Sequence, residues 1–201
     1  MVLAKNYSSA TGVDEFYYGV LQPDDVKIVE TKPERVKYLQ EINVDMPQEI
    51  SKAYGDNGIA EMATSNGDIS VTSQFHKVPM EDKTKLLGWE TKTGITAAGK
   101  NDNSPYVAVI FAKTYEDGTR EYVGLPKGKF MRPGVKGETK KEGVEFSSDE
   151  MTAEFMDRIV EGFEDEKSVF FAIDAKGETT NRDALFLKIF GVTHPDVVPG
   201  P

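Results

Sequence analysis

The residues best suited to acid–base or metal chemistry are sparse in this chain. There are two histidines, His76 and His194, and neither has a second histidine at metal-ligand spacing. A catalytic histidine needs an orienting partner and a reactive group, and neither a G-x-S-x-G nor an H-E-x-x-H motif occurs. The absence of cysteine excludes disulfides, thiolate metal sites and a cysteine nucleophile. We therefore expect structural or solvated histidines, and no enzyme activity, cofactor or metal.

Two short motifs resemble ligand loops but fail on spacing. Residues 124–130 carry the glycines and lysines of a phosphate loop, yet the glycine spacing is one residue short and Phe130 replaces the metal-binding Ser or Thr. A strand broken at Pro126 explains the motif better. Residues 101–103 could begin a calcium loop, but Ala112 occupies the twelfth position, where a glutamate is needed. We interpret this segment as a polar loop.

Charge is segregated along the sequence. Residues 127–141 hold six bases and one acid, whereas residues 147–166 hold eight acids and one base. Charge runs of this kind are commonly solvated faces. The alternative is that they are complementary patches that meet between identical subunits. The residues that we assign to such patches are Lys136, Lys140, Lys141, Glu154, Glu161 and Glu164.

The elements that would position these residues are mainly strands. Asn-Gly and Asp-Gly turns recur between short apolar runs, which is typical of hairpins. Residues 69–75 alternate between apolar and polar, which predicts a half-buried strand. The runs 106–112 and 168–173 are apolar on both faces, so we expect each to be buried in the core and against something else, such as another subunit. Many short strands indicate a sandwich or barrel.

Two short helices interrupt the strands. Pro79 and the acids that follow it predict a helix over residues 79–87, ended by Gly88. A second helix is predicted over 184–190, followed by an irregular tail. Residues 151–163 are ambiguous: apolar side chains at every fourth position favour a helix, but the same segment also reads as a strand.

Composition bounds the class of protein. The chain has 201 residues, 38% of them hydrophobic, and a net charge of −10. We predict one domain over 1–201, with an N-terminal arm (1–13) and a C-terminal tail (191–201). No apolar run approaches the roughly 18 residues of a membrane span, and the first residues lack the apolar core of a signal peptide. The acidic balance argues against gripping nucleic acid through its phosphates.

The order of several short segments resembles a known family. The segments are Tyr54-Gly-Asp-Asn57, Gly67-Asp-Ile-Ser-Val71, Leu86-Leu-Gly-Trp89, Pro105-Tyr-Val-Ala-Val109, the Asp117-Gly118 turn, Arg120-Glu-Tyr-Val123 and Lys127-Gly-Lys-Phe130. Together they resemble the major tail protein of long, flexible, non-contractile (siphovirus-type) bacteriophage tails, over roughly residues 17–174.

This resemblance implies a fold and a function. The fold would be two packed antiparallel sheets, as a sandwich or half-barrel, with a flanking short helix and a C-terminal helix. The subunit would form stacked hexameric rings around a tape-measure protein, and it would contact tail terminator and distal tail proteins. The tube would belong to the virion tail, be assembled in the host cytoplasm, and conduct double-stranded DNA without binding it specifically. An acidic lumen would let DNA slide.

The resemblance also suggests assembly residues. Residues 44–54 fall where tube proteins place a long loop that contacts the next ring. The loop residues that we assign to this contact are Met46, Pro47, Gln48, Glu49, Ile50, Ser51 and Lys52. The resemblance further favours a strand at 150–156. The alternative function is a β-sandwich module that binds carbohydrate or a host surface, for which Trp89 would be the sole available tryptophan.

Overall fold

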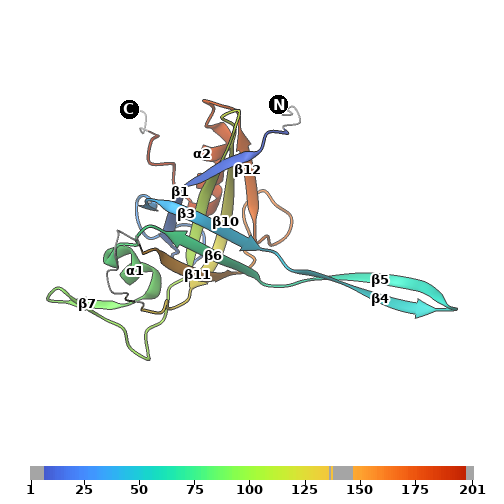
Figure 1. The fold of residues 1–201 in the computed structure, drawn as a ribbon, viewed down its shortest axis with the longest axis horizontal. Coiled ribbons are helices and arrows are strands. Elements are labelled where there is room, and N and C mark those ends of the chain that lie inside the picture. Colours follow the sequence, from blue (N-terminus) through green and yellow to red (C-terminus); the bar gives the residue numbers. More distant parts are fainter. Residues whose placement is uncertain (1–6, 136, 138–146, 198–201) are drawn as a thin grey trace, which may run out of the picture.

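The structure is a computed structural model that describes residues 7–135, 137 and 147–197. The described chain is mainly β, with antiparallel pairing throughout and two helices (Figure 1). Within these residues the strands do not close into a barrel. The predicted mainly β fold with a flanking helix and a C-terminal helix is therefore confirmed. No helix of the described part is long and apolar enough to cross a membrane.

The main sheet has eight strands and branches at one of them. Its path is β2 (Glu34–Val36), β1 (Ala10–Val20), β9 (Val107–Tyr115), β10 (Arg120–Phe130), β11 (Asp149–Phe155), β6 (Ile69–Phe75) and β3 (Leu39–Asp45), and β12 (Phe170–Asp174) also pairs with β10. The first half of β10 pairs with β12 and its end pairs with β11. The two sheets of the predicted fold are thus continuous through β10, which passes Pro126 with a register shift.

Strand β9 has an almost entirely apolar sequence because it is buried on both faces. Val107, Val109 and Phe111 join a core that includes helix α1 (Met80–Leu87). The alternate residues, Ala108 and Ile110 among them, lie under helix α2 (Thr180–Phe190). Burial on both faces was expected from the sequence. The second cover of this strand is a helix of the same chain and not another subunit.

Strand β12 is covered on one face alone. Phe170 is buried against α2, but Phe171 and Ile173 on the other face are 55% and 42% exposed. Within the described residues β12 pairs with β10 and with no second strand, although the Asn181 side chain donates to the Ile173 carbonyl oxygen at 2.7 Å. An apolar edge strand without a lysine or proline is a site for association with another chain.

The two helices are fixed by caps. Helix α1 follows Pro79 and ends at Gly88, whose φ of 66° is left-handed. A Cβ at Gly88 would lie 2.4 Å from the Asn103 carbonyl oxygen, so glycine is required there. Helix α2 begins at Thr180, four residues before the predicted start. The buried Asp174 carboxylate, on β12, accepts hydrogen bonds from the first amides of α2 at 2.8 and 3.0 Å.

Residues 151–163, whose sequence fits both a helix and a strand, begin as a strand. Met151, Ala153 and Phe155 are buried between β6 and β10 as part of β11. Beyond Phe155 the chain is irregular, and Ile159 is exposed. The helical spacing of the apolar residues was misleading because only its first part enters the sheet.

The ends of the described chain are tied to the fold. Residues 10–13 of the predicted N-terminal arm already belong to β1, and residues 1–6 lie outside the described part. The C-terminal segment beyond α2 has neither helix nor strand through residue 197, yet His194 within it is 1% exposed. A small exposed hairpin, β7 (Glu90–Lys92) and β8 (Ile95–Ala97), projects beside α1 (Figure 1).

Candidate functional site

The most prominent feature of the molecule is a hairpin that projects from the main sheet. Strands β4 (Gln48–Gly55) and β5 (Gly58–Asn66) pair with each other alone, and every residue of both is exposed. Figure 1 shows this hairpin extending away from the rest of the fold. We call it the arm. The prediction of a loop at residues 44–54 is wrong in its local structure. Residues 44 and 45 end β3, and from Gln48 onward the chain is strand β4, whose pairing with β5 shifts register between Ala53 and Tyr54. The hairpin turns at Asp56 and Asn57, which have left-handed backbones.

The two faces of the arm differ strongly. Residues opposite each other on paired strands share a face, so Ile50, Lys52 and Tyr54 lie on the same face as their partners on β5, Thr64, Met62 and Ile59. The four large apolar side chains of this face are 51–73% exposed. The other face carries Glu49, Ser51, Ala53, Glu61, Ala63 and Ser65. The arm thus has an apolar face, with Lys52 as its one charge, and a face of small and acidic residues.

The root of the arm is held in register with the main sheet. The Gly67 amide donates to the Pro47 carbonyl oxygen at 2.9 Å, and Gln48 donates to the Asn66 side chain at 3.0 Å. A Cβ at Gly67 would approach the Pro47 ring to 2.8 Å. Strands β3 and β6 pair on the inner side of this junction. The arm is therefore a continuation of the β3–β6 pair rather than a separate unit.

A groove of about 970 Å³ opens beside the root of the arm. Its walls come from the root, from the turn around Asp25 and from the irregular segment after β11. Apolar side chains on its rim are exposed, including Met46, Met156 and Ile159. Acidic residues outnumber basic ones five to two in its lining. We call this feature the root groove.

Arg158 ties the walls of the root groove to α2. Its guanidinium donates to the Asp25 carbonyl oxygen at 3.0 Å and to the Lys188 and Ile189 carbonyl oxygens at 3.0 and 2.9 Å. Cations stabilise helix C-termini because the last carbonyls carry partial negative charge. Burial lowers the pKa of Arg158 to about 10, which leaves the group charged at neutral pH. Sequence reasoning missed this residue, because its partners are backbone atoms far away in the chain.

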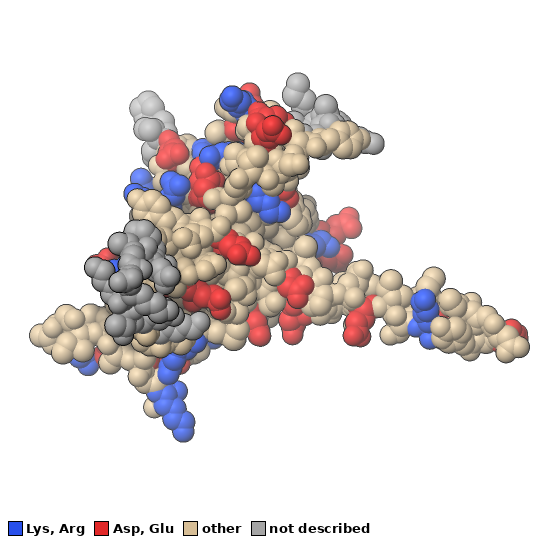
Figure 2. All heavy atoms as spheres, in the orientation of Figure 1, with Lys and Arg blue, Asp and Glu red and all other residues tan. Residues whose placement is uncertain are grey.

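The outward face of β11, β6 and β3 is polar and acidic. Cross-strand rows on this face are Glu154–Ser70–Asp45, Thr152–Thr72–Asn43 and Glu150–Gln74–Glu41. The inward residues of the same strands, such as Val71 and Met151, are buried. Figure 2 shows acidic side chains gathered over this part of the molecule, next to the arm. Glu154 therefore lies on an exposed polar sheet face.

The predicted charge patches are only partly visible. Lys136, Lys140 and Lys141 lie outside the described residues. Glu161 and Glu164 are exposed in the irregular segment after β11, and Glu154 is on the polar sheet face. The described bases of the patch have local partners: Lys127 pairs with Asp25, Lys129 donates to Asn103, and Arg132 donates to the Gly99 carbonyl oxygen. The structure does not bring the six assigned patch residues together within the part that it describes.

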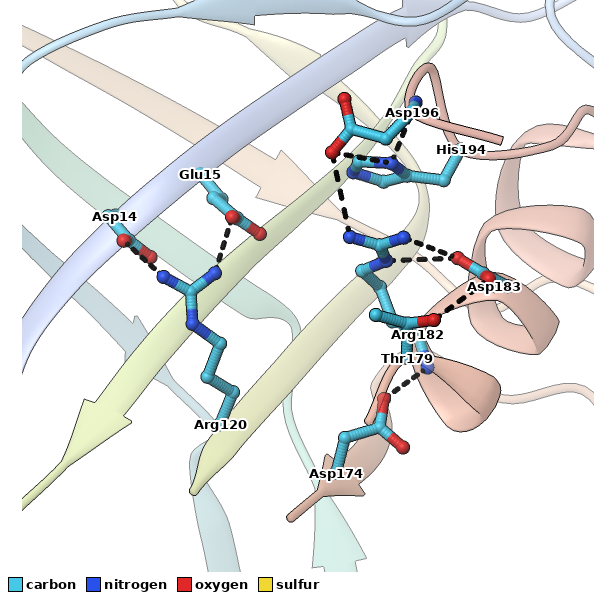
Figure 3. Close-up of polar contacts among 9 residues, drawn as sticks. All are labelled: Asp14, Glu15, Arg120, Asp174, Thr179, Arg182, Asp183, His194 and Asp196. Carbon is cyan, nitrogen blue, oxygen red and sulfur yellow. Dashed lines mark hydrogen bonds and ion pairs between the residues drawn. The ribbon is translucent and has the colours of Figure 1, made fainter. Parts of the chain in front are cut away.

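Two arginines outside these surfaces form ion pairs that connect elements of the fold (Figure 3). Arg120 bridges Asp14 and Glu15, and Arg182 pairs with Asp183 and Asp196. Burial raises the pKa of Asp14 against the opposing charge of Arg120. The described residues contain no group of three or more His, Asp or Glu side chains that could hold a metal ion.

The two histidines differ in their surroundings. His194 packs edge-on against the rings of Tyr17 and Phe186, and its Nδ1 accepts the Asp196 amide hydrogen at 3.1 Å. Burial, followed by the nearby Arg182 charge, lowers the pKa of His194. His76 is exposed and lies edge-on to Tyr38. Trp89, the aromatic that a carbohydrate-binding module would present, packs against the main core.

The arm, the polar sheet face and most of the root groove lie within a stretch, residues 39–195, that matches a known family described as phage tail tube protein. This chain belongs to that family. No curated protein sequence matches it significantly. Two solved structures match this chain at low structural similarity. One is the sheath–tube complex of the PVC extracellular contractile injection system in its extended state, with 9% identity, a TM-score of 0.42, and coverage of 80% of this chain and 88% of that chain. The other is the tube-terminating cap of the anti-feeding prophage, with 12% identity, a TM-score of 0.41, and coverage of 87% and 96%.

Proposed function

We propose that this tail tube protein forms the tube of a non-contractile phage tail by stacking in hexameric rings around a tape-measure protein, and that its arm makes the contact between rings. The observation that carries the proposal is the exposed apolar face of the arm. A two-stranded hairpin alone in water is marginally stable. A regular hairpin whose large side chains all gather on one exposed face is suited to cover by another chain.

The energy available from docking the arm is substantial. Full burial of a large aliphatic or aromatic side chain contributes about 1.5–3 kcal/mol. The four large residues of the apolar face are 51–73% exposed, so covering them would contribute about 4–7 kcal/mol per arm before the costs of association. Repeated at every subunit of a tube, this contribution favours stacking.

The outer edge of β12 supports a second contact, within a ring. Its exposed Phe171 and Ile173 lie on a strand that has no second strand partner among the described residues. A neighbouring copy that added a strand there would gain apolar cover and main-chain hydrogen bonds, in competition with the Asn181 side chain at the Ile173 carbonyl oxygen.

The polar face of β11, β6 and β3 is the surface that we propose for the lumen. It presents hydroxyl, amide and carboxylate groups and no large apolar side chain along its paired rows. A DNA duplex gains affinity for a protein mainly where lysine and arginine neutralise its phosphates. An acidic lining would therefore let DNA, the cargo of the tube, pass through without specific binding during ejection.

The charge patches remain a separate part of the proposal. We expect bases of the 127–141 segment to meet Glu154, Glu161 or Glu164 of another copy. Single exposed ion pairs contribute only about 0–1 kcal/mol. Reversal of Lys136, Lys140 and Lys141 to glutamate should slow tube formation and leave the melting temperature of the subunit nearly unchanged. Normal assembly kinetics from this triple variant would assign these residues to solvated faces instead.

Serine substitutions on the two faces of the arm test its role. The variant Ile50→Ser/Tyr54→Ser/Met62→Ser removes apolar cover, and it should raise the concentration needed for assembly by at least about tenfold, because about 1.4 kcal/mol corresponds to a factor of ten. The matched control, Ala53→Ser/Ala63→Ser, changes the opposite face and should assemble as the parent does. Sedimentation velocity against protein concentration provides the measurement. Equal assembly by both variants would refute the role of the apolar face.

A further inference from the structure

The root groove and the apolar face of the arm have complementary chemistry. The face offers exposed apolar side chains around one base, Lys52. The groove offers exposed apolar rim residues around an excess of acids. In Figure 1 the arm points away from its own root, so its outer part cannot fill the groove beside that root. We propose that the root groove of a second copy receives the apolar face of the arm; this inference rests on the proposed role of the arm.

The charges of the groove favour Lys52 in particular. Both groove bases are already engaged, Lys127 by Asp25 and Arg158 by three backbone carbonyls. Among the residues that the structure describes, four acids of the groove lining, Asp24, Asp68, Asp157 and Glu166, are exposed and have no ion-pair partner; Asp157 and Glu166 lie in the segment that carries the apolar rim residues Met156 and Ile159. An ammonium group that is buried at an interface needs a carboxylate partner. Asp157 and Glu166 supply that partner at a place with apolar surface on either side.

The location of the groove determines how copies would connect. Because the groove adjoins the root of the arm, each copy carries the groove at one end of the hairpin and the outer part of the apolar face, which would enter the groove of the next copy, at the other end. An eight-residue strand spans about 27 Å, and this length sets the reach from one root to the next. A contact between two different surfaces of the same chain continues indefinitely unless rotation closes it. Such a contact is compatible with an open series of copies, as the stacking of rings requires.

Crosslinking tests the contact directly, because the chain has no cysteine of its own. The double variant Tyr54→Cys/Ile159→Cys places one thiol on the apolar face and one on the groove rim. Treatment of assembling protein with a short bis-maleimide should give a ladder of covalent dimers, trimers and larger species on a denaturing gel. Each single variant carries one thiol and stops at dimers. If the double variant also stops at dimers under assembling conditions, the groove is not the receptor.

Charge reversal provides a second readout. Lys52→Glu should raise the concentration needed for assembly about tenfold, since it sets like charges opposite each other. Asp157→Lys/Glu166→Lys should do the same, and combining all three changes should restore assembly. The matched control is Glu178→Lys, an exposed acid outside the groove, which should have no such effect.

The outcomes separate this inference from the proposed function. If the serine variant of the apolar face fails to assemble while the charge variants behave like the parent, the arm docks elsewhere and the groove assignment is wrong. If the serine variant assembles normally, the role of the arm itself is lost. Rescue by the triple charge change, together with the covalent ladder, supports both.

Discussion

Replacing Arg158 with methionine should destabilise the subunit more than any surface change nearby. The substitution keeps a long side chain but removes every donor. It leaves the carbonyl oxygens of Asp25, Lys188 and Ile189 without their present partner. Hydrogen bonds from a charged donor contribute about 1.5–3 kcal/mol each, and such bonds are not additive within one group. We expect a loss of about 3–5 kcal/mol in the free energy of unfolding.

Urea and thermal unfolding, followed by circular dichroism, measure this loss. For a chain of this size each kcal/mol lowers the melting temperature by about 2–4 °C, so a decrease of about 6–20 °C is expected. Lys167→Met, in the exposed segment that pairs with Arg158 through its backbone, is the control and should change stability by less than about 0.5 kcal/mol. A loss below about 1 kcal/mol for Arg158→Met would show that water satisfies these carbonyls and would refute the reasoning.

Two further predictions concern the C-terminal part of the fold. Because burial and Arg182 hold the pKa of His194 below its usual 6.5, the unfolded state binds the extra proton, and stability should fall as pH drops below about 6.5; His194→Phe should flatten this part of a pH–stability curve, and an unchanged slope would contradict the assignment. Asp174→Ala removes two hydrogen bonds at the start of α2 and should cost about 1–3 kcal/mol in chemical denaturation, whereas Glu178→Ala, an exposed neighbour, should cost almost nothing.

Local sequence signals correctly predicted those elements in which the order of apolar and polar residues matches the order of buried and exposed residues. Strand β6 alternates in the sequence as it does in the structure, with Val71 and Phe75 buried. The Asp117–Gly118 turn predicted the β9–β10 hairpin, and Gly118 does adopt a left-handed conformation. Proline before α1 and glycine after it placed the ends of that helix within a residue. In each case the residues that set the structure are neighbours in the chain.

Features set by distant partners could not be found in this way. The start of α2 depends on Asp174, which belongs to the preceding strand β12. The second cover of β9 is that same helix, some seventy residues later in the chain. The resemblance implied a loop where the arm lies. The local pattern gives no clear strand signal there, because Lys52 interrupts the apolar residues of one face and no core buries either side. The root groove combines residues 24–26, 46–48, 66–69 and 155–159 with Lys127, Glu166 and Ser168, so no single stretch of sequence signals it.

The central claim is that copies of this tail tube protein assemble with one another through the arm. Negative-stain electron microscopy of the purified protein at increasing concentration tests this claim most directly, with the serine variant of the apolar face and its Ala53→Ser/Ala63→Ser control on the same grids. The account predicts rings or tubes for the parent and the control, and isolated subunits or single rings for the variant. Tubes formed equally well by the variant, or no association of the parent at any concentration, would contradict it.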